Sequence, residues 1–182
     1  RDSTSTIPVG RGLGSSAALS IAIARAKKLP NIREIANKCE KFIHGNPSGI
    51  DVNQVLSDTP LLFSKKEGAS ELNFDLNSYL LIIDTGVVGI TKETLKHIED
   101  NYIEYEKYIA ELGEITDSVI EPLKNKNIDL VGQYMYKAHD LLRKLGVSHA
   151  SNDEVVEICK NNNAIGAKLT GGGAGGLSLI HI

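Results

Sequence analysis

Apolar residues recur at helical spacing through the first quarter of the chain. Residues 15–29 are rich in Ala, Leu and Ile and carry Lys27 and Lys28 in what reads as a last turn, where cations favour a helix. After a break at Pro30-Asn31, apolar positions three and four residues apart predict an amphipathic helix that ends near His44-Gly45. Its apolar members are Ile32, Ile35, Ala36, Cys39, Phe42 and Ile43.

Short apolar runs and further helical patterns share the rest of the chain. A short helix is predicted from Asn46-Pro47-Ser48 through Gln54, and strands are predicted at 61–63, 71–74, 79–83 and 165–169. Helices are predicted at 91–113, 114–126, 128–145 and 153–160, the last one capped by Asn152 or Asp153. Strands and helices that do not strictly alternate indicate an α+β or two-domain α/β protein. We place a domain boundary near residue 76, which divides the chain into 1–76 and 77–182.

Composition excludes several classes of function. The chain has 182 residues, of which 41% are hydrophobic and 24% charged, as in ordinary globular proteins. A net charge of -3 does not suggest a nucleic-acid binder. Neither a membrane-length apolar run nor a signal peptide is present, and Cys39 and Cys159 lack metal-ligand spacing. We expect a cytoplasmic protein that binds neither nucleic acid nor membrane.

Both ends of the chain are unusual. It begins without Met, in residues 1–7 that read as the end of a strand, and it stops soon after a glycine-rich loop. We therefore expect a reading frame cut at both ends. Residues 177–182 also resemble one reading frame of a transposon-end adapter used in DNA library preparation. The alternative is a genuine final strand, because Leu-Ser-Leu-Ile alternates acceptably.

A first glycine-rich loop stands directly before the first helix. Gly10, Gly12 and Gly14 precede Ser15 and Ser16. Glycines let the backbone approach a polyanion and point several N–H groups at it, and a helix N-terminus adds partial positive charge. The pattern is neither a Walker A loop nor a good dinucleotide fingerprint. From the glycines alone, a phosphate-binding loop and a plain glycine turn with a serine cap both stay open.

Two further segments are candidates for chemistry. Glu40 is followed by the segment 44–51, His-Gly-Asn-Pro-Ser-Gly-Ile-Asp, which is rich in turn formers and polar side chains and is typical of a shaped site. Asp51 falls just inside a helix start, where a carboxylate also favours structure alone, so both interpretations stay open. The segment 168–176 carries five glycines after a predicted strand, with a flexible linker as the alternative.

These motifs carry a family resemblance. Residues 8–18, Pro-x-Gly-x-Gly-Leu-Gly-Ser-Ser-Ala-Ala, resemble the signature of the GHMP kinases, named for galactokinase, homoserine kinase, mevalonate kinase and phosphomevalonate kinase. Glu40 with the segment 44–51, and the segment 145–151, resemble the mevalonate kinase form. The resemblance covers residues 7–176. It implies an α+β GHMP kinase fold, with a ribosomal protein S5 domain 2-like N-terminal domain and a ferredoxin-like C-terminal domain.

The resemblance also implies an activity, namely transfer of the ATP γ-phosphoryl group to the 5-hydroxyl of mevalonate in isoprenoid biosynthesis, with ATP and Mg²⁺ as cofactors. Ser16 and Glu40 would be magnesium ligands, and Asp51 the catalytic carboxylate that accepts or orients the substrate hydroxyl. The resemblance places Thr85 and His149 on the substrate side, with a strand-end hydroxyl and a loop-packing histidine as alternatives. The residues implied to hold the nucleotide are Gly10, Arg11, Gly12, Leu13, Gly14, Ser15, Ser16, Gly171, Gly172 and Gly173.

Several alternatives remain open. Another GHMP kinase, such as phosphomevalonate kinase, would share the magnesium site and use a different acceptor. A non-catalytic sensor on the kinase scaffold is opposed by the presence of Ser16, Glu40 and Asp51. The family's lysine-bearing N-terminal motif does not precede Arg1, so the activity of this chain alone stays open, as does a homodimer. In the second loop, Gly172 and Ala174 are exchanged relative to the family pattern, which would cost stability if Ala174 is left-handed.

Overall fold

The computed structural model describes residues 4–87, 91–174 and 176–181, which form two compact units. Unit 1 contains Leu13–Asn73 together with the residues before Gly10, and unit 2 contains Gly10–Gly12 and the chain from Phe74 onward. The first glycine loop is therefore divided between the two units at the Gly12–Leu13 peptide bond. The main division of the chain falls between Asn73 and Phe74.

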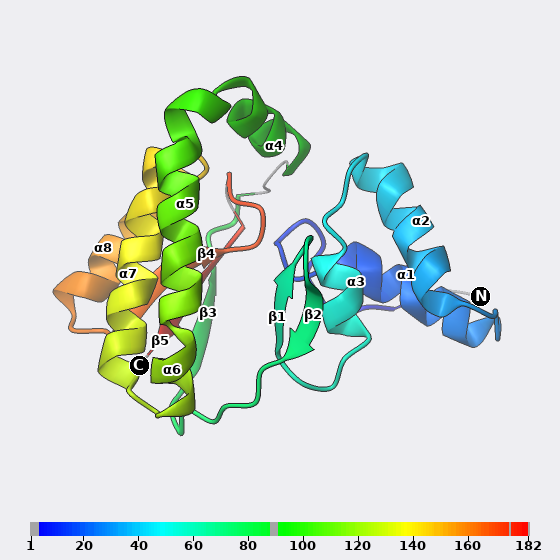
Figure 1. Ribbon diagram of the computed structural model, residues 1–182, viewed down its shortest axis with the longest axis horizontal. Coiled ribbons are helices and arrows are strands. Elements are labelled where there is room, and N and C mark those ends of the chain that lie inside the picture. Colours follow the sequence, from blue (N-terminus) through cyan, green and yellow to red (C-terminus); the bar gives the residue numbers. More distant parts are fainter. Residues whose placement is uncertain (1–3, 88–90, 175, 182) are drawn as a thin grey trace. The chain divides into compact units, whose positions relative to one another are not determined.

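The described residues of unit 1 form three helices and one hairpin (Figure 1). The helices are α1 (Ser15–Ala26), α2 (Ile32–His44) and α3 (Ile50–Val55), and the antiparallel hairpin pairs β1 (Leu61–Ser64) with β2 (Gly68–Glu71). Apolar residues on one face of each helix meet in a small core, because their helical spacing turns them to the same side. The core residues are Ala17, Ile21, Ala36 and Val52, with Ile32, Val55 and Leu56 packed against them.

Several predicted features of unit 1 need correction. α1 ends at Ala26, so Lys27 caps the helix instead of lying in its last turn. α2 has the predicted end, but Phe42 is 92% exposed, so the apolar stripe is not buried along its whole length. β2 begins at Gly68, upstream of the predicted 71–74, because a short turn closed by Gly68 at φ 83° sets the hairpin register. Residues 4–9 form no strand.

Unit 2 combines five helices of the described chain with a three-stranded antiparallel sheet (Figure 1). The helices are α4 (Thr91–Asp100), α5 (Tyr102–Ser118), α6 (Ile120–Lys124), α7 (Ile128–Lys144) and α8 (Ala150–Asn161). The strands are β3 (Leu80–Asp84), β4 (Gly166–Thr170) and β5 (Leu177–His181), in the order β3-β5-β4. Asp84 and Thr170 are both in register with Leu177, so the end of β3, the end of β4 and the start of β5 lie at one edge of the sheet.

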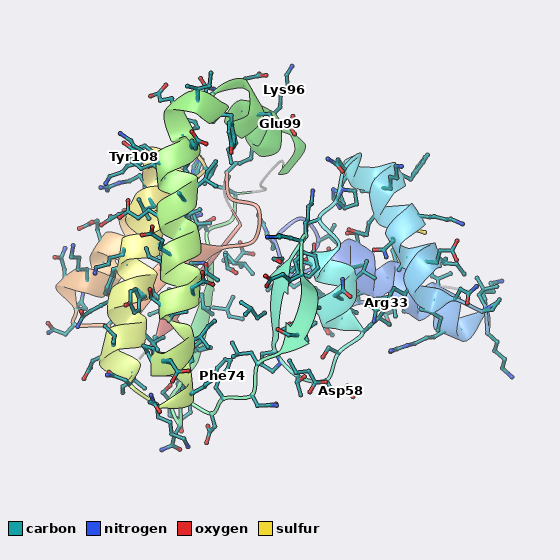
Figure 2. All side chains as sticks on the ribbon, in the orientation of Figure 1. Arg33, Asp58, Phe74, Lys96, Glu99 and Tyr108 are labelled. Carbon is teal, nitrogen blue, oxygen red and sulfur yellow. The ribbon has the colours of Figure 1, made fainter. Side chains whose placement is uncertain are left out.

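Helices cover this sheet and contact one another. Val156 of α8 packs with Ala167 of β4 and Ile180 of β5 in the core of the unit. Figure 2 shows Tyr108 on α5, where the ammonium groups of Lys107 and Lys144 lie 4.7 and 5.7 Å from the ring centroid. Because Lys144 belongs to α7, this cation–π contact joins two helices.

The helix boundaries in unit 2 also differ from the prediction. The patterns predicted at 91–113 and 114–126 divide after Asp100 and Ser118 instead. α8 begins at Ala150, earlier than predicted, because His149 caps it where Asn152 or Asp153 was expected. α7 and β4 form where the periodicity predicted them. Among the described residues, no helix is both long enough and apolar enough to cross a membrane.

Candidate active site

The first glycine loop ends at the N-terminus of α1. Gly10, Gly12 and Gly14 all have positive φ, at 72°, 78° and 64°, and Gly14 is the N-cap residue. Alternate left-handed residues turn successive N–H groups toward one side, and the first N–H groups of a helix have no acceptor within the helix. The arrangement is therefore suited to an anion such as phosphate.

Asp51 lies next to this loop within unit 1. A Cβ atom built on Gly14 would stand 3.7 Å from Oδ1 of Asp51, so the carboxyl group lies beside the start of α1. The side chain is exposed, yet neighbouring atoms displace part of its hydration, which raises the pKa of Asp51 above its usual value. His44 opposes this shift of the pKa. A carboxylate of raised basicity beside an anion site is suited to accept a proton.

Ser16 and Glu40 converge on His44. The Nε2 atom of His44 lies 3.2 Å from Oγ of Ser16 and 3.6 Å from Oε2 of Glu40. The predicted pair of magnesium ligands thus shares one neighbour. The contact of His44 with both residues was not predicted from sequence. The contact between His44 and Glu40 could have been predicted, because the two residues are four positions apart on one predicted helix.

Glu40 fits the role of a metal ligand by its environment. Its side chain is 2% exposed, and its Oε1 atom is buried without a hydrogen-bond partner among the described residues. A carboxylate oxygen in that state lacks a cation or donor. No group of three or more His, Cys, Asp or Glu side chains in the described part of the chain could hold a metal. Two oxygen donors suit Mg²⁺, which completes its coordination with phosphates and water.

The second glycine loop touches the first within unit 2. A Cβ atom on Gly12 would come 2.9 Å from Cα of Gly171, and one on Gly171 would come 2.6 Å from Cα of Gly12. Only glycines allow so close a backbone approach. Further along the loop, the N–H of Ala174 donates to the carbonyl of Val147 at 2.7 Å. Gly175 lies outside the described residues.

Thr85 and His149 both have local partners in unit 2. The Thr85 hydroxyl donates to the carbonyl of Gly176 at 2.7 Å, so it holds the second glycine loop. His149 is exposed, and its Nδ1 atom accepts the N–H of Ser151 at 3.2 Å as the cap of α8. Thr85 thus makes the contact of a strand-end hydroxyl, whereas His149 is an exposed helix cap and not a packed loop residue.

A buried network behind the second loop was not predicted. Nδ1 of His139 accepts the N–H of Leu169 at 3.2 Å, and its Nε2 faces Oδ1 of Asp153 at 3.1 Å. The Ser148 hydroxyl donates to the same Asp153 oxygen at 2.6 Å. The network links α7, α8 and the strand that leads into the second glycine loop. Its members are far apart in sequence, so local pattern could not reveal it.

Two family models match this chain. The model of the GHMP kinases N terminal domain matches residues 2–57, and the model of the GHMP kinases C terminal domain matches residues 119–180. The two glycine loops and the α+β architecture agree with that class of protein. The chain belongs to the GHMP kinase family and has its fold.

Mevalonate kinases are among the similar proteins. The mevalonate kinase of Pyrococcus horikoshii is 34% identical over 190 residues, which cover 95% of this chain and 56% of that protein. The crystal structure of the Methanococcus jannaschii mevalonate kinase matches with a TM-score of 0.77 at 27% identity, over 98% of this chain and 59% of that one. Streptococcus pneumoniae phosphomevalonate kinase, with a TM-score of 0.75 at 15% identity over 94% of this chain and 61% of that one, shares the fold. The chain spans little more than half the length of these relatives.

Proposed function

We propose that the protein containing this chain is an ATP-dependent kinase that transfers the γ-phosphoryl group of ATP to the 5-hydroxyl of mevalonate. The observation that carries the proposal is the Asp51 carboxyl group beside Gly14, at a helix start built to receive phosphate. The mevalonate kinases of P. horikoshii and M. jannaschii, at 34% and 27% identity, support mevalonate as the acceptor.

The nucleotide would be held mainly by backbone. In this proposal, N–H groups of residues 10–16 and the orphan N–H groups at the start of α1 bind the phosphates. Gly171, Gly172 and Gly173 of the second loop add backbone that can approach closely because it carries no side chains. Positioning and charge neutralisation supply most of the rate in phosphoryl transfer, so a few side chains suffice.

Ser16 and Glu40 would hold Mg²⁺ through their oxygen atoms, since the buried, unpartnered Oε1 of Glu40 lacks a cation. When bound, the ion neutralises charge on the ATP phosphates. Asp51 would accept the proton of the acceptor hydroxyl while that oxygen bonds to the γ-phosphorus and the bond to the β-phosphate oxygen breaks. The products are ADP and the phosphate ester, and the proton leaves through Asp51.

The proposal is tested first at Asp51. We expect Asp51→Asn to lower kcat about 10²- to 10⁴-fold, because the general base is lost. Binding of a non-hydrolysable ATP analogue should change little, since the backbone holds the phosphates. Release of ADP and calorimetric binding measure the two quantities. The matched control is Asp58→Asn, an exposed carboxylate in the same unit (Figure 2), which should leave both unchanged. Normal turnover by Asp51→Asn would remove Asp51 from the mechanism.

An acceptor panel with ATP identifies the substrate. Mevalonate, phosphomevalonate, homoserine and galactose are compared by kcat/KM with the whole protein that contains this chain. We expect mevalonate to be preferred. Preference for phosphomevalonate would favour the sister kinase, and ATP binding without turnover of any acceptor would favour a non-catalytic sensor.

A further inference from the structure

A turn at the end of β3, residues 84–87, contacts both glycine loops within unit 2. Oδ2 of Asp84 pairs with Nε of Arg11 in the first loop at 3.2 Å. The other carboxylate oxygen, Oδ1, accepts the N–H of Gly86 at 2.9 Å, which fixes the carboxylate on its own turn. Asp84 therefore connects the first glycine loop to the end of a sheet strand.

The same turn holds the second glycine loop. The Thr85 N–H and hydroxyl both donate to the carbonyl of Gly176, at 3.1 and 2.7 Å. The N–H of Gly176 donates in turn to the carbonyl of Val87 at 2.7 Å. A Cβ atom on Gly176 would come 3.2 Å from the carbonyl oxygen of Arg11, so the two loops also meet here. Both loops thus make polar contacts with the same turn, residues 84–87.

Arg11 is the only residue of the Gly10–Gly12 segment that has a side chain. Among the described residues, the segment makes no backbone hydrogen bond outside regular elements, so its one polar tie is the pair with Asp84. Glycine segments have large conformational freedom and do not hold a left-handed conformation by themselves. The Arg11–Asp84 pair therefore restrains a segment that would otherwise lose its order readily.

Asp84 compensates the charge of the mostly buried Arg11 side chain. The Arg11 side chain is only 17% exposed, against 43% for Asp84. Nη1 of Arg11 is buried without an acceptor among the described residues, so Asp84 is the carboxylate that compensates the guanidinium in that part of the chain. Removing the anion leaves a mostly buried cation unpaired, which is costly.

We infer that Arg11 and Asp84 are positioning residues for the nucleotide. The pair holds residues 10–12 in the conformation that turns their N–H groups to one side, and so lowers the ordering cost of binding the ATP phosphates. This inference rests on the proposed function and adds to it a side-chain pair that acts on the nucleotide without touching it. The acceptor is not involved, so the effect should be confined to ATP.

The test compares Arg11→Gln, Asp84→Asn, the double variant and Arg11→Lys. We expect the two single variants to weaken calorimetric binding of a Mg²⁺-bound, non-hydrolysable ATP analogue about three- to tenfold, as for a partly buried ion pair. The double variant should bind no more weakly than Asp84→Asn, because the residues act as one pair. Arg11→Lys should stay within about twofold of the parent, since only Nε of Arg11 pairs and a single ammonium can replace it.

Kinetics and a control pair separate positioning from general damage. KM for ATP should rise with the analogue Kd, while kcat and KM for the acceptor change less than about twofold. Lys126→Gln and Asp75→Asn remove another unit 2 ion pair, 3.0 Å apart and exposed, and should leave analogue binding unchanged.

The outcomes are distinguishable. A parent protein that does not bind the analogue overturns the proposed function and this inference with it. A parent that binds, with variants that bind equally well, overturns this inference alone. Equal losses for ATP and acceptor, together with a lower midpoint of thermal unfolding, would reduce the pair to a structural role and also overturn it.

Discussion

The backbone of Ala174 is strained. Its φ is 58°, in the left-handed region where an L side chain costs about 1–2 kcal/mol. The resemblance to the GHMP kinase loop implies a glycine at this position. The strain indicates that the exchange of Gly172 and Ala174 has a conformational cost.

Ala174→Gly should therefore stabilise the protein by about 0.5–1 kcal/mol, the relief of strain minus the added freedom of the unfolded chain. The free energy of unfolding is measured in urea. Gly173→Ala is the control of opposite sign, because φ is 79° there and a Cβ atom would come 2.2 Å from the carbonyl of Val147. We expect it to destabilise the protein by about 2 kcal/mol or more. A loss of stability in Ala174→Gly would contradict the argument.

His139 makes stability depend on pH. Burial lowers the pKa of His139, and Arg143 acts in the same direction, while Asp153 and Asp140 oppose the shift. Because its Nδ1 accepts the Leu169 N–H, the folded state needs the neutral ring. The unfolded state binds the proton more tightly, so lowering the pH favours unfolding.

The free energy of unfolding should accordingly fall as the pH drops below about 6.5 and through the lowered pKa of His139. His139→Gln should cost about 1–3 kcal/mol at pH 7.5 and flatten this dependence. Burial also lowers the pKa of His181, so part of the slope should remain. An unchanged slope in His139→Gln would refute the assignment.

Candidate site residues could be proposed from sequence where they fall in short motifs. Ser16, Glu40 and Asp51 were proposed in this way, and unit 1 brings Ser16 and Glu40 to His44 and Asp51 to Gly14. Pairs such as Arg11–Asp84 and His139–Asp153 could not be predicted. Their partners come from different elements, and only the folded topology joins them.

Two glycines within helices differ in how closely the rest of the chain approaches them. Gly132 in α7 packs directly on the chain entering β4, where a Cβ atom would come 2.0 Å from the carbonyl oxygen of Ile165. Gly113 in α5 has nothing within 4 Å of such an atom. Helix propensity alone would favour Ala at both sites by about 1 kcal/mol.

We expect Gly113→Ala to stabilise the protein by about 0.5–1 kcal/mol and Gly132→Ala to destabilise it by about 2–4 kcal/mol. The difference arises because α7 can approach β4 only through bare backbone. Thermal and urea unfolding of the two variants measure it. Gain of stability in Gly132→Ala would mean that α7 does not pack on β4 as described.

Helices and strands could be predicted where apolar periodicity shows their extent and where helix-breaking residues mark their ends. The strong periods of α2 and α7 were sufficient to locate both helices. The predicted start of α8 was wrong, because its N-cap is His149 and histidine is not among the residues that usually mark a helix N-terminus. The break at Asn101 between α4 and α5 also carries no Gly or Pro, so nothing local marks it.

In the molecule as a whole, the two units differ in their buried cores and in their sheets. The core of unit 1 contains two alanines among its four buried members, and the sheet formed by its described residues is a two-stranded hairpin, which is marginal alone. Phe42 of α2 and Ile23 of α1 remain 92% and 50% exposed. Unit 2 has a three-stranded sheet whose members pack against α7 and α8.

Native-state hydrogen exchange should therefore find lower protection in α1 and α2 than in α7, β4 and β5. A difference of about 1.4 kcal/mol in opening free energy, or a tenfold ratio of exchange rates after correction for intrinsic rates, is the smallest effect expected. Because the first glycine loop belongs to both units, opening of unit 1 would disturb Leu13 to Ser16 while leaving residues 10–12 anchored through Arg11. Equal protection throughout would mean that the two units unfold as one, and the division of the loop would then have no energetic consequence.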